Sequence, residues 1–169
     1  MKEYIYLGKV SNTHGIKGEI RIKSDFEKKN LVFKKNFNLY FGKSKDCESI
    51  NTYRIHKEYD MVTLNGLNNI NDVIKYKGMS VFVKRNDLNL ENSEYIIEDL
   101  IGLNIKENEK VLGIIEDFMY NNGNVLLCIR GVKNFYIPYN GNFIKKVDFN
   151  NKTVECENVR DLIIWGLTY

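Results

Sequence analysis

The chain has 169 residues, of which 43% are hydrophobic and 28% charged, which is typical of a globular protein and excludes a disordered or fibrous one. Its 25 basic and 22 acidic residues give a formal charge of +3, too balanced to predict tight autonomous binding of nucleic acid. No apolar run reaches the roughly 18 residues of a membrane-spanning helix, and no secretion signal opens the chain, so a cytoplasmic location is expected.

Alternating apolar and polar side chains predict a small closed β-barrel in the first half of the chain. A loop with two glycines joins its first two strands. A short helical turn is expected near residues 25–33 with Asp25 as its cap, and a helix over 71–78 with Asn71 as its cap. The predicted strands are 4–10, 19–23, 38–41, 50–57, 60–64 and 80–84.

A polar segment over residues 87–94 predicts a linker, because apolar residues resume at once in the run from Tyr95 to Gly102. The sequence therefore predicts one domain over 1–86 and a second over 95–169. The second is also expected to be mainly β, with a bulge or corner at Gly113, a hairpin turn over 121–124 and a helix near 159–166. Its predicted strands are 103–106, 111–119, 124–130, 135–138 and 153–156.

No catalytic, cofactor-binding or metal-ligating set emerges from the sequence. Cys47, Cys128 and Cys156 are odd in number and far apart, which argues against a disulfide framework or a zinc site and favours buried thiols at the last two positions. His14 lies in the glycine-framed loop without a predicted nucleophile or orienting acid. A structural role, a partner contact and catalysis all stay open for His14.

Several motifs resemble the RimM family of ribosome maturation factors, in the same order along nearly the whole chain. L-G-K-V at 7–10 and T-H-G-I-K-G-E-I at 13–20 resemble the opening signature of the family. D-L-I-G at 99–102, L-G-I-I-E-D at 112–117, I-P-Y at 137–139 and F-I-K-K-V-D at 143–148 resemble its second half, a module called the PRC-barrel.

The resemblance implies two small β-barrels, the first similar to barrels of translation elongation factors. It also implies a monomeric, non-catalytic assembly factor of the 30S subunit that uses no cofactor. Such a factor binds ribosomal protein S19 in the subunit head and assists maturation of the 3′ region of 16S rRNA. The family usually has two adjacent tyrosines before D-L-I-G, tied to subunit binding, whereas this chain has Tyr95 and Ile96. Expected partner contacts are Tyr95, Ile96, His14, Lys17, Asp99, Lys145 and Lys146.

The same residues also allow purely structural roles. Tyr95 could seal the second barrel, and Asp99 could close the turn before Gly102 through local hydrogen bonds. Paired lysines such as Lys145 and Lys146 are often solvated, but lysines that converge on one face would meet rRNA phosphates. The sequence predicts no platform of exposed aromatic side chains for stacking on bases. The alternative functions are an autonomous β-barrel that binds RNA and an enzyme that uses the His14 loop.

Overall fold

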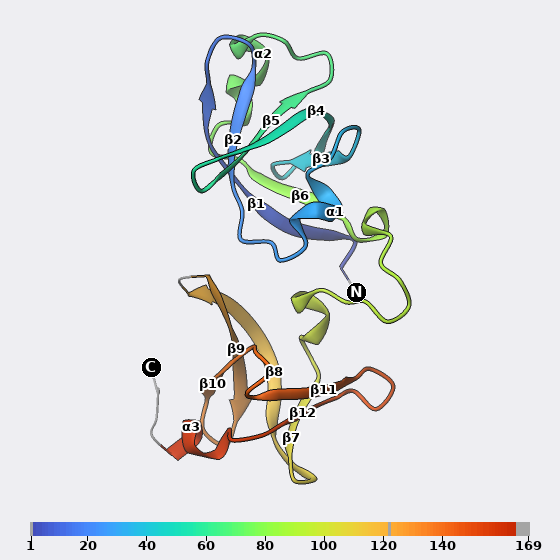
Figure 1. Ribbon diagram of the computed structural model, residues 1–169, viewed down its shortest axis with the longest axis vertical. Helices are drawn as coiled ribbons and strands as arrows, with labels where there is room; N and C mark the ends of the chain where they lie inside the picture. Colours follow the sequence, from blue (N-terminus) through green and yellow to red (C-terminus); the bar gives the residue numbers. More distant parts are fainter. Residues whose placement is uncertain (1, 122, 165–169) are drawn as a thin grey trace. The chain divides into compact units, whose positions relative to one another are not determined.

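The computed structural model describes residues 2–121 and 123–164, and Figure 1 shows two β-rich units along the chain. The boundary between them falls after Glu94, where the predicted linker ends. Within the described ranges, no helix is long and apolar enough to cross a bilayer.

The first unit is a closed barrel in which two long strands pair on both sides. The first half of β1 (Tyr4–His14) pairs with β6 and its second half with β2, while β4 (Asp46–His56) pairs first with β3 and then with β5. Register shifts in both long strands mark β-bulges, which bend a strand and so help a sheet to close. The other strands are β2 (Glu19–Lys23), β3 (Asn38–Phe41), β5 (Tyr59–Leu64) and β6 (Ser80–Lys84).

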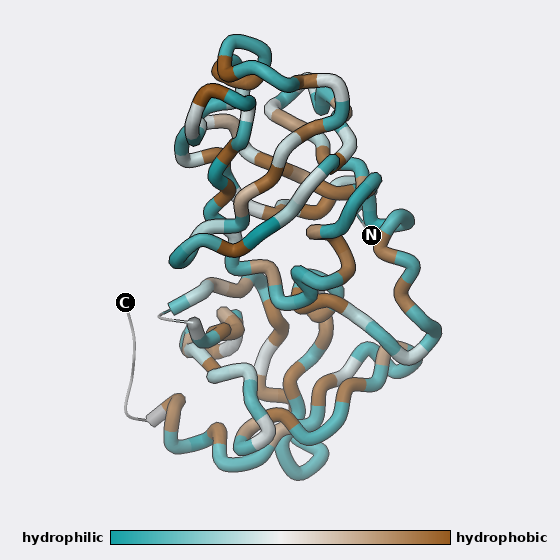
Figure 2. The backbone as a smooth tube through the Cα atoms, turned by 45° about the horizontal axis from the view of Figure 1, so that its top comes forward, coloured by the Kyte–Doolittle hydropathy of each residue, from teal (hydrophilic) through white to brown (hydrophobic). Residues whose placement is uncertain are grey.

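Successive side chains of these strands point to opposite faces of the sheet. One set therefore fills the inside of the barrel, and the other set covers its outside. In β6, Val81 and Val83 are fully buried, whereas Phe82 between them is only partly covered. Figure 2 shows the same pattern as hydrophobic residues interspersed with hydrophilic ones along the chain. Residues that form the core of this barrel include Ile5, Leu7, Ile20, Ile22, Leu39, Phe41, Ile50, Val62 and Leu64.

The predicted helical turn is shorter than expected and Asp25 does not cap it. Helix α1 covers only Lys29–Val32, and no side chain caps its first turn. A helix of four residues is unstable alone, so tertiary contacts must hold it. Lys29 Nζ lies 2.6 Å from the buried carboxylate of Asp60, which also accepts a hydrogen bond of 2.9 Å from the Tyr53 hydroxyl. Burial, and then the bond to Asp60, raise the pKa of Tyr53 to about 12.

The second helix begins two residues earlier than predicted, because its cap is Asn69 rather than Asn71. Helix α2 (Ile70–Val73) continues as the 3₁₀ turn η1 (Ile74–Tyr76). The Asn69 side chain accepts the N–H of Asn71 at 2.9 Å, and the Asp72 carboxylate accepts the N–H of Asn69 at 3.2 Å. Asn69 and Asn71 are both residues that commonly cap helices. Asn69 is the cap because its backbone is extended directly before the first helical residue.

The second unit is a six-stranded sheet in the order β10-β9-β8-β7-β12-β11. Strands β7 to β10 pair consecutively and antiparallel, while the hairpin of β11 and β12 returns beside β7, with β12 parallel to it. The strands are β7 (Asn104–Glu107), β8 (Lys110–Asn121), β9 (Asn124–Gly131), β10 (Phe135–Pro138), β11 (Ile144–Asp148) and β12 (Thr153–Cys156). Short helices are η2 (Arg85–Leu88) in the first unit and η3 (Ile97–Leu100) and α3 (Arg160–Ile164) in the second.

Both edges of this sheet contribute to one core, so the sheet curls around it. Ile137 of β10 and Val154 of β12 are fully buried in the same cluster, and Val147 of β11 packs against it. The register shifts beside Gly113, where an added Cβ would lie 2.7 Å from the Arg130 carbonyl oxygen, as expected at a bulge or corner. The hairpin turn predicted over 121–124 includes residue 122, outside the described residues, as are the last residues of the predicted helix. The predicted fold class, mainly β with two small barrels, is confirmed.

The choice of helix cap can be tested by substitution. We expect Asn69→Ala to lower the free energy of unfolding by about 1 kcal/mol, because the N–H of Asn71 loses its acceptor. The matched control is Asn71→Ala, which removes an exposed amide and should change the free energy by less than about 0.5 kcal/mol. Urea denaturation followed by circular dichroism measures both. Equal losses in the two variants would contradict the assignment.

The buried thiol of Cys156 predicts a pH dependence of stability. Burial, and then the nearby Glu107, raise the pKa of Cys156 to about 12, so the folded chain keeps this thiol protonated. The unfolded chain ionises it above about pH 8.5, so stability falls as the pH rises through that value. Between pH 7.5 and 9.5 we expect the wild type to lose about 1 kcal/mol more than Cys156→Ala in urea denaturation. Parallel pH profiles for the two proteins would rule out this effect.

Candidate functional site

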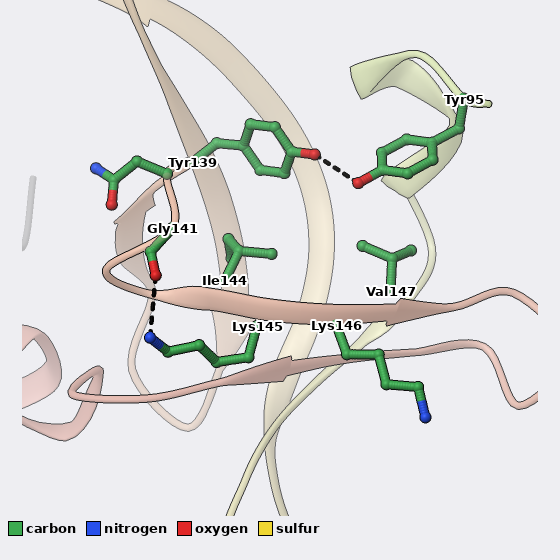
Figure 3. Close-up of a pocket in the computed structure, with 8 residues that line it drawn as sticks. Tyr95, Tyr139, Gly141, Ile144, Lys145, Lys146 and Val147 are labelled. Carbon is green, nitrogen blue, oxygen red and sulfur yellow. Dashed lines mark hydrogen bonds between the residues drawn. The ribbon is translucent and has the colours of Figure 1, made fainter. Parts of the chain in front are cut away.

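A pair of tyrosines from distant parts of the sequence defines the best-formed candidate site in the second unit. The hydroxyl groups of Tyr95, just before η3, and Tyr139, just after β10, lie 2.7 Å apart and share a hydrogen bond. Figure 3 shows the two rings pointing toward each other above Ile144 and Val147 of β11. The pair therefore combines two polar hydroxyl groups with an apolar floor.

A third aromatic ring extends this pair toward solvent. Phe149, directly after β11, packs edge-to-face on Tyr95 with 5.3 Å between ring centroids, yet 43% of it stays exposed. An exposed phenylalanine beside two half-buried tyrosines is a suitable anchor for a protein partner, because aromatic side chains supply large contact areas at low entropic cost. The hollow beside the tyrosines has a volume of about 220 Å³, and its lining residues are Tyr95, Tyr139, Asn140, Gly141, Ile144, Lys145, Lys146 and Val147.

The two predicted lysines lie on β11 as well, but on the other side of the strand. The register against β12 shifts between Ile144 and Lys146, so Lys145 is the extra residue of a β-bulge. The bulge lets two successive lysines face solvent, where a regular strand would send one of them inward. Figure 3 shows both pointing away from the tyrosine pair. Lys145 donates to the Gly141 carbonyl at 3.0 Å and lies 3.4 Å from Glu157, so it is held in place.

The other two predicted residues of this unit have local structural positions. Ile96 is only 1% exposed, and a partner contact at this position stays a prediction. The Asp99 carboxylate accepts the N–H of Ile96 at 3.0 Å, which agrees with the interpretation that it closes this turn through local hydrogen bonds.

His14 and Lys17 belong to the first unit and are not part of the tyrosine site. His14 ends β1, and Lys17 is exposed in the turn that follows. An Arg21 nitrogen lies 2.7 Å from His14 Nδ1. Because arginine only donates hydrogen bonds, Nδ1 must be the acceptor, and the ring proton therefore sits on Nε2. In this state neither ring nitrogen has a free lone pair for a general base.

The acid nearest to His14 across the strands is also engaged. Glu19 pairs with His14 in the β1–β2 register, but its carboxylate binds Arg54 through two hydrogen bonds of 2.5 and 2.9 Å. In this arrangement the Glu19 carboxylate is bonded to Arg54 rather than to His14. Within residues 2–121 and 123–164, no group of three or more His, Cys, Asp or Glu side chains could hold a metal ion.

Sequence reasoning missed two members of the aromatic site, Tyr139 and Phe149. Tyr139 follows the only proline of the chain, and Phe149 follows the strand that carries the two lysines. Neither position signals that the residue meets Tyr95, since these contacts depend on how the ends of β10 and β11 approach the start of η3.

Both units match models of one protein family. Residues 5–88 match the RimM N-terminal domain, and residues 97–162 match the RimM PRC barrel domain. The solved N-terminal domain of RimM from Thermus thermophilus covers 53% of this chain and 98% of its own length, at 18% identity and a TM-score of 0.44. Because this structural similarity is low, the family is assigned from the sequence matches instead.

Curated relatives match along almost their whole length. A ribosome maturation factor RimM from Staphylococcus haemolyticus is 31% identical over 164 residues, which is 94% of this chain and 98% of the relative. One from Staphylococcus aureus is 34% identical over 155 residues, covering 89% and 93%. With both domain models in order and relatives of this similarity along its length, the chain belongs to the RimM family.

Proposed function

We propose that this chain is a non-catalytic maturation factor of the small ribosomal subunit, working in the cytoplasm where subunits assemble. It binds ribosomal protein S19 in the head of the pre-30S particle and assists processing of the 3′ region of 16S rRNA. The observation that carries this proposal is the match to both RimM domains over most of the chain, with relatives named as ribosome maturation factors.

The surface around β11 supports docking led by a protein partner. Tyr95, Tyr139 and Phe149 offer apolar area and hydroxyl groups on one side of the strand, which suits a protein surface. Lys145 and Lys146 offer positive charge on the other side, which suits rRNA phosphates beside that protein. The surface around β11 thus offers aromatic contacts for a ribosomal protein and positive charge for the RNA around that protein.

The His14 loop supports binding rather than chemistry. Its histidine accepts a hydrogen bond from Arg21, and the neighbouring Glu19 is committed to Arg54. Such a network holds the loop in one shape, and a fixed loop is suited to contact with a partner.

Substitution of the tyrosine site tests the docking surface. We expect Tyr95→Ala to weaken binding to S19 and to small subunits about tenfold, because an aromatic anchor and its hydroxyl group are both lost. Tyr95→Phe should weaken binding only a few-fold, because the ring stays and one hydrogen bond is lost. Pull-down with S19 and sedimentation with purified small subunits measure both effects.

Matched controls come from the same unit. Tyr120→Ala removes a tyrosine on β8 that does not line the hollow, and it should leave binding unchanged. Lys146→Glu should weaken association with the subunit and flatten its salt dependence, whereas Lys110→Glu, an exposed lysine on β8, should do neither. If the wild-type chain neither binds S19 nor co-migrates with free small subunits, the proposal is wrong.

The rival function, an enzyme that uses the His14 loop, makes a different prediction. We expect His14→Ala to restore normal 16S rRNA processing in a deletion strain, because no proton transfer depends on the ring. An enzyme would lose about a hundredfold or more of its rate when its general base is removed. Primer extension across the 3′ region of 16S rRNA measures the precursor. His14→Gln serves as a control that keeps a side chain able to bond Arg21.

A further inference from the structure

Aromatic side chains gather on the outer face of the first barrel, across three adjacent strands. Tyr4 and Tyr6 of β1 point outward between buried core residues, as do Phe82 of β6 and Tyr40 of β3. Tyr6 lies opposite Phe82 in the β1–β6 register, and Phe82 lies opposite Tyr40 in the β3–β6 register. We call these four residues the aromatic face.

The rings of the aromatic face support one another. Tyr6 meets Phe82 edge-to-face at 5.8 Å between centroids, and Tyr4 meets Tyr40 in the same manner at 5.2 Å. Tyr40 is 8% exposed and Tyr6 is 54% exposed, so the face has a buried base and one ring open to solvent. Burial, and then the charge of Asp25, raise the pKa of Tyr6, so this open ring stays neutral at physiological pH.

Two lysines are interleaved with these rings. Lys45 Nζ lies 3.4 Å from the centroid of Phe82, and Lys84 Nζ lies 5.6 and 5.5 Å from the centroids of Tyr4 and Tyr40. Lys45 also donates to the Gly42 carbonyl at 3.0 Å, which uses one of its three N–H donors. Lys84 is 3.6 Å from Glu3, so one acid partly offsets its charge. The ammonium groups are thus fixed beside the rings.

We propose that the aromatic face with Lys45 and Lys84 binds single-stranded RNA. A base stacks on the exposed ring of Tyr6, which Phe82 orients from its edge, and the flanking phosphates contact Lys45 and Lys84. This goes beyond the proposed function: it gives the first unit a ligand of its own, and it stands whether or not the second unit binds S19.

The chemistry of this face favours a single strand over a duplex or a protein. Aromatic platforms with interleaved cations bind single-stranded nucleic acid, because every base has a face to stack and every linkage has a charge. A duplex hides the base faces in its own stack, so only its phosphates could engage. A protein partner would need carboxylates placed against both cations, whereas every linkage of a nucleic acid strand carries a charge.

The test uses the full-length chain and a fluorescent 12-nucleotide oligouridine, with an RNA duplex of equal length for comparison. Fluorescence anisotropy at low salt should show binding of the single strand and weaker binding of the duplex. Tyr6→Ala should weaken binding of the single strand about tenfold, which is the effect of one lost base stack. Lys45→Gln should weaken binding and lower the slope of log affinity against log salt by about 0.7, which is one phosphate contact.

Control substitutions separate this face from general effects. Ile55→Ala removes another exposed apolar side chain from the same barrel, 70% exposed on β4, and should leave RNA binding unchanged. Lys110→Gln removes one positive charge from the second unit and should not alter the salt slope as Lys45→Gln does. Glu3→Gln releases Lys84 from its partner and should tighten binding, a gain that no loss of folding can imitate.

Three results would overturn the proposal: no binding of oligouridine by the wild type at low salt, equal affinity for the duplex, or unchanged binding by both Tyr6→Ala and Lys45→Gln. Capture of S19 by those two variants should equal that of the wild type, so failure here and failure of the proposed function can be told apart. Protein docking on this face would appear as loss of S19 capture without loss of RNA binding.

Discussion

The two-residue period of the β-strand is the constraint on which both units depend. Because successive side chains leave a strand on opposite sides, the residues that fill a barrel also determine which residues cover it. Val81 and Val83 occupy the first core, which obliges Phe82 and Lys84 to face outward. The outer surface of a small barrel is therefore a direct consequence of its core.

Interruptions of this period provide the rest of the architecture. Bulges in β1 and β4 let each long strand bend and pair with two neighbours, which closes the first barrel. The bulge at Lys145 has a different effect, since it leaves Lys145 and Lys146 both at the surface of β11. Regular alternation thus builds the cores. The β-bulges, where alternation is interrupted, bend the long strands and place two lysines at the surface of β11.

Much of the fold could be predicted because strand alternation is a local property. The predicted strands 38–41, 80–84, 135–138 and 153–156 have the same bounds as β3, β6, β10 and β12. The short helices were predicted less well, because four-residue helices depend on tertiary contacts. Asp25 is not a cap, and α1 is instead held by the ion pair of Lys29 with Asp60, a residue 31 positions away.

The sequence by itself determined the mainly β class, most strand positions and, through motifs in the right order, the resemblance to the RimM family. Only the tertiary structure decided which side chains come together to form surfaces. It joined Tyr95 to Tyr139 across 44 positions, buried Ile96, and assembled Tyr6, Phe82 and Lys45 on one face. The physical reason is that alternation depends only on neighbours in the chain, whereas contacts between strands depend on register, and a bulge of one residue changes the register.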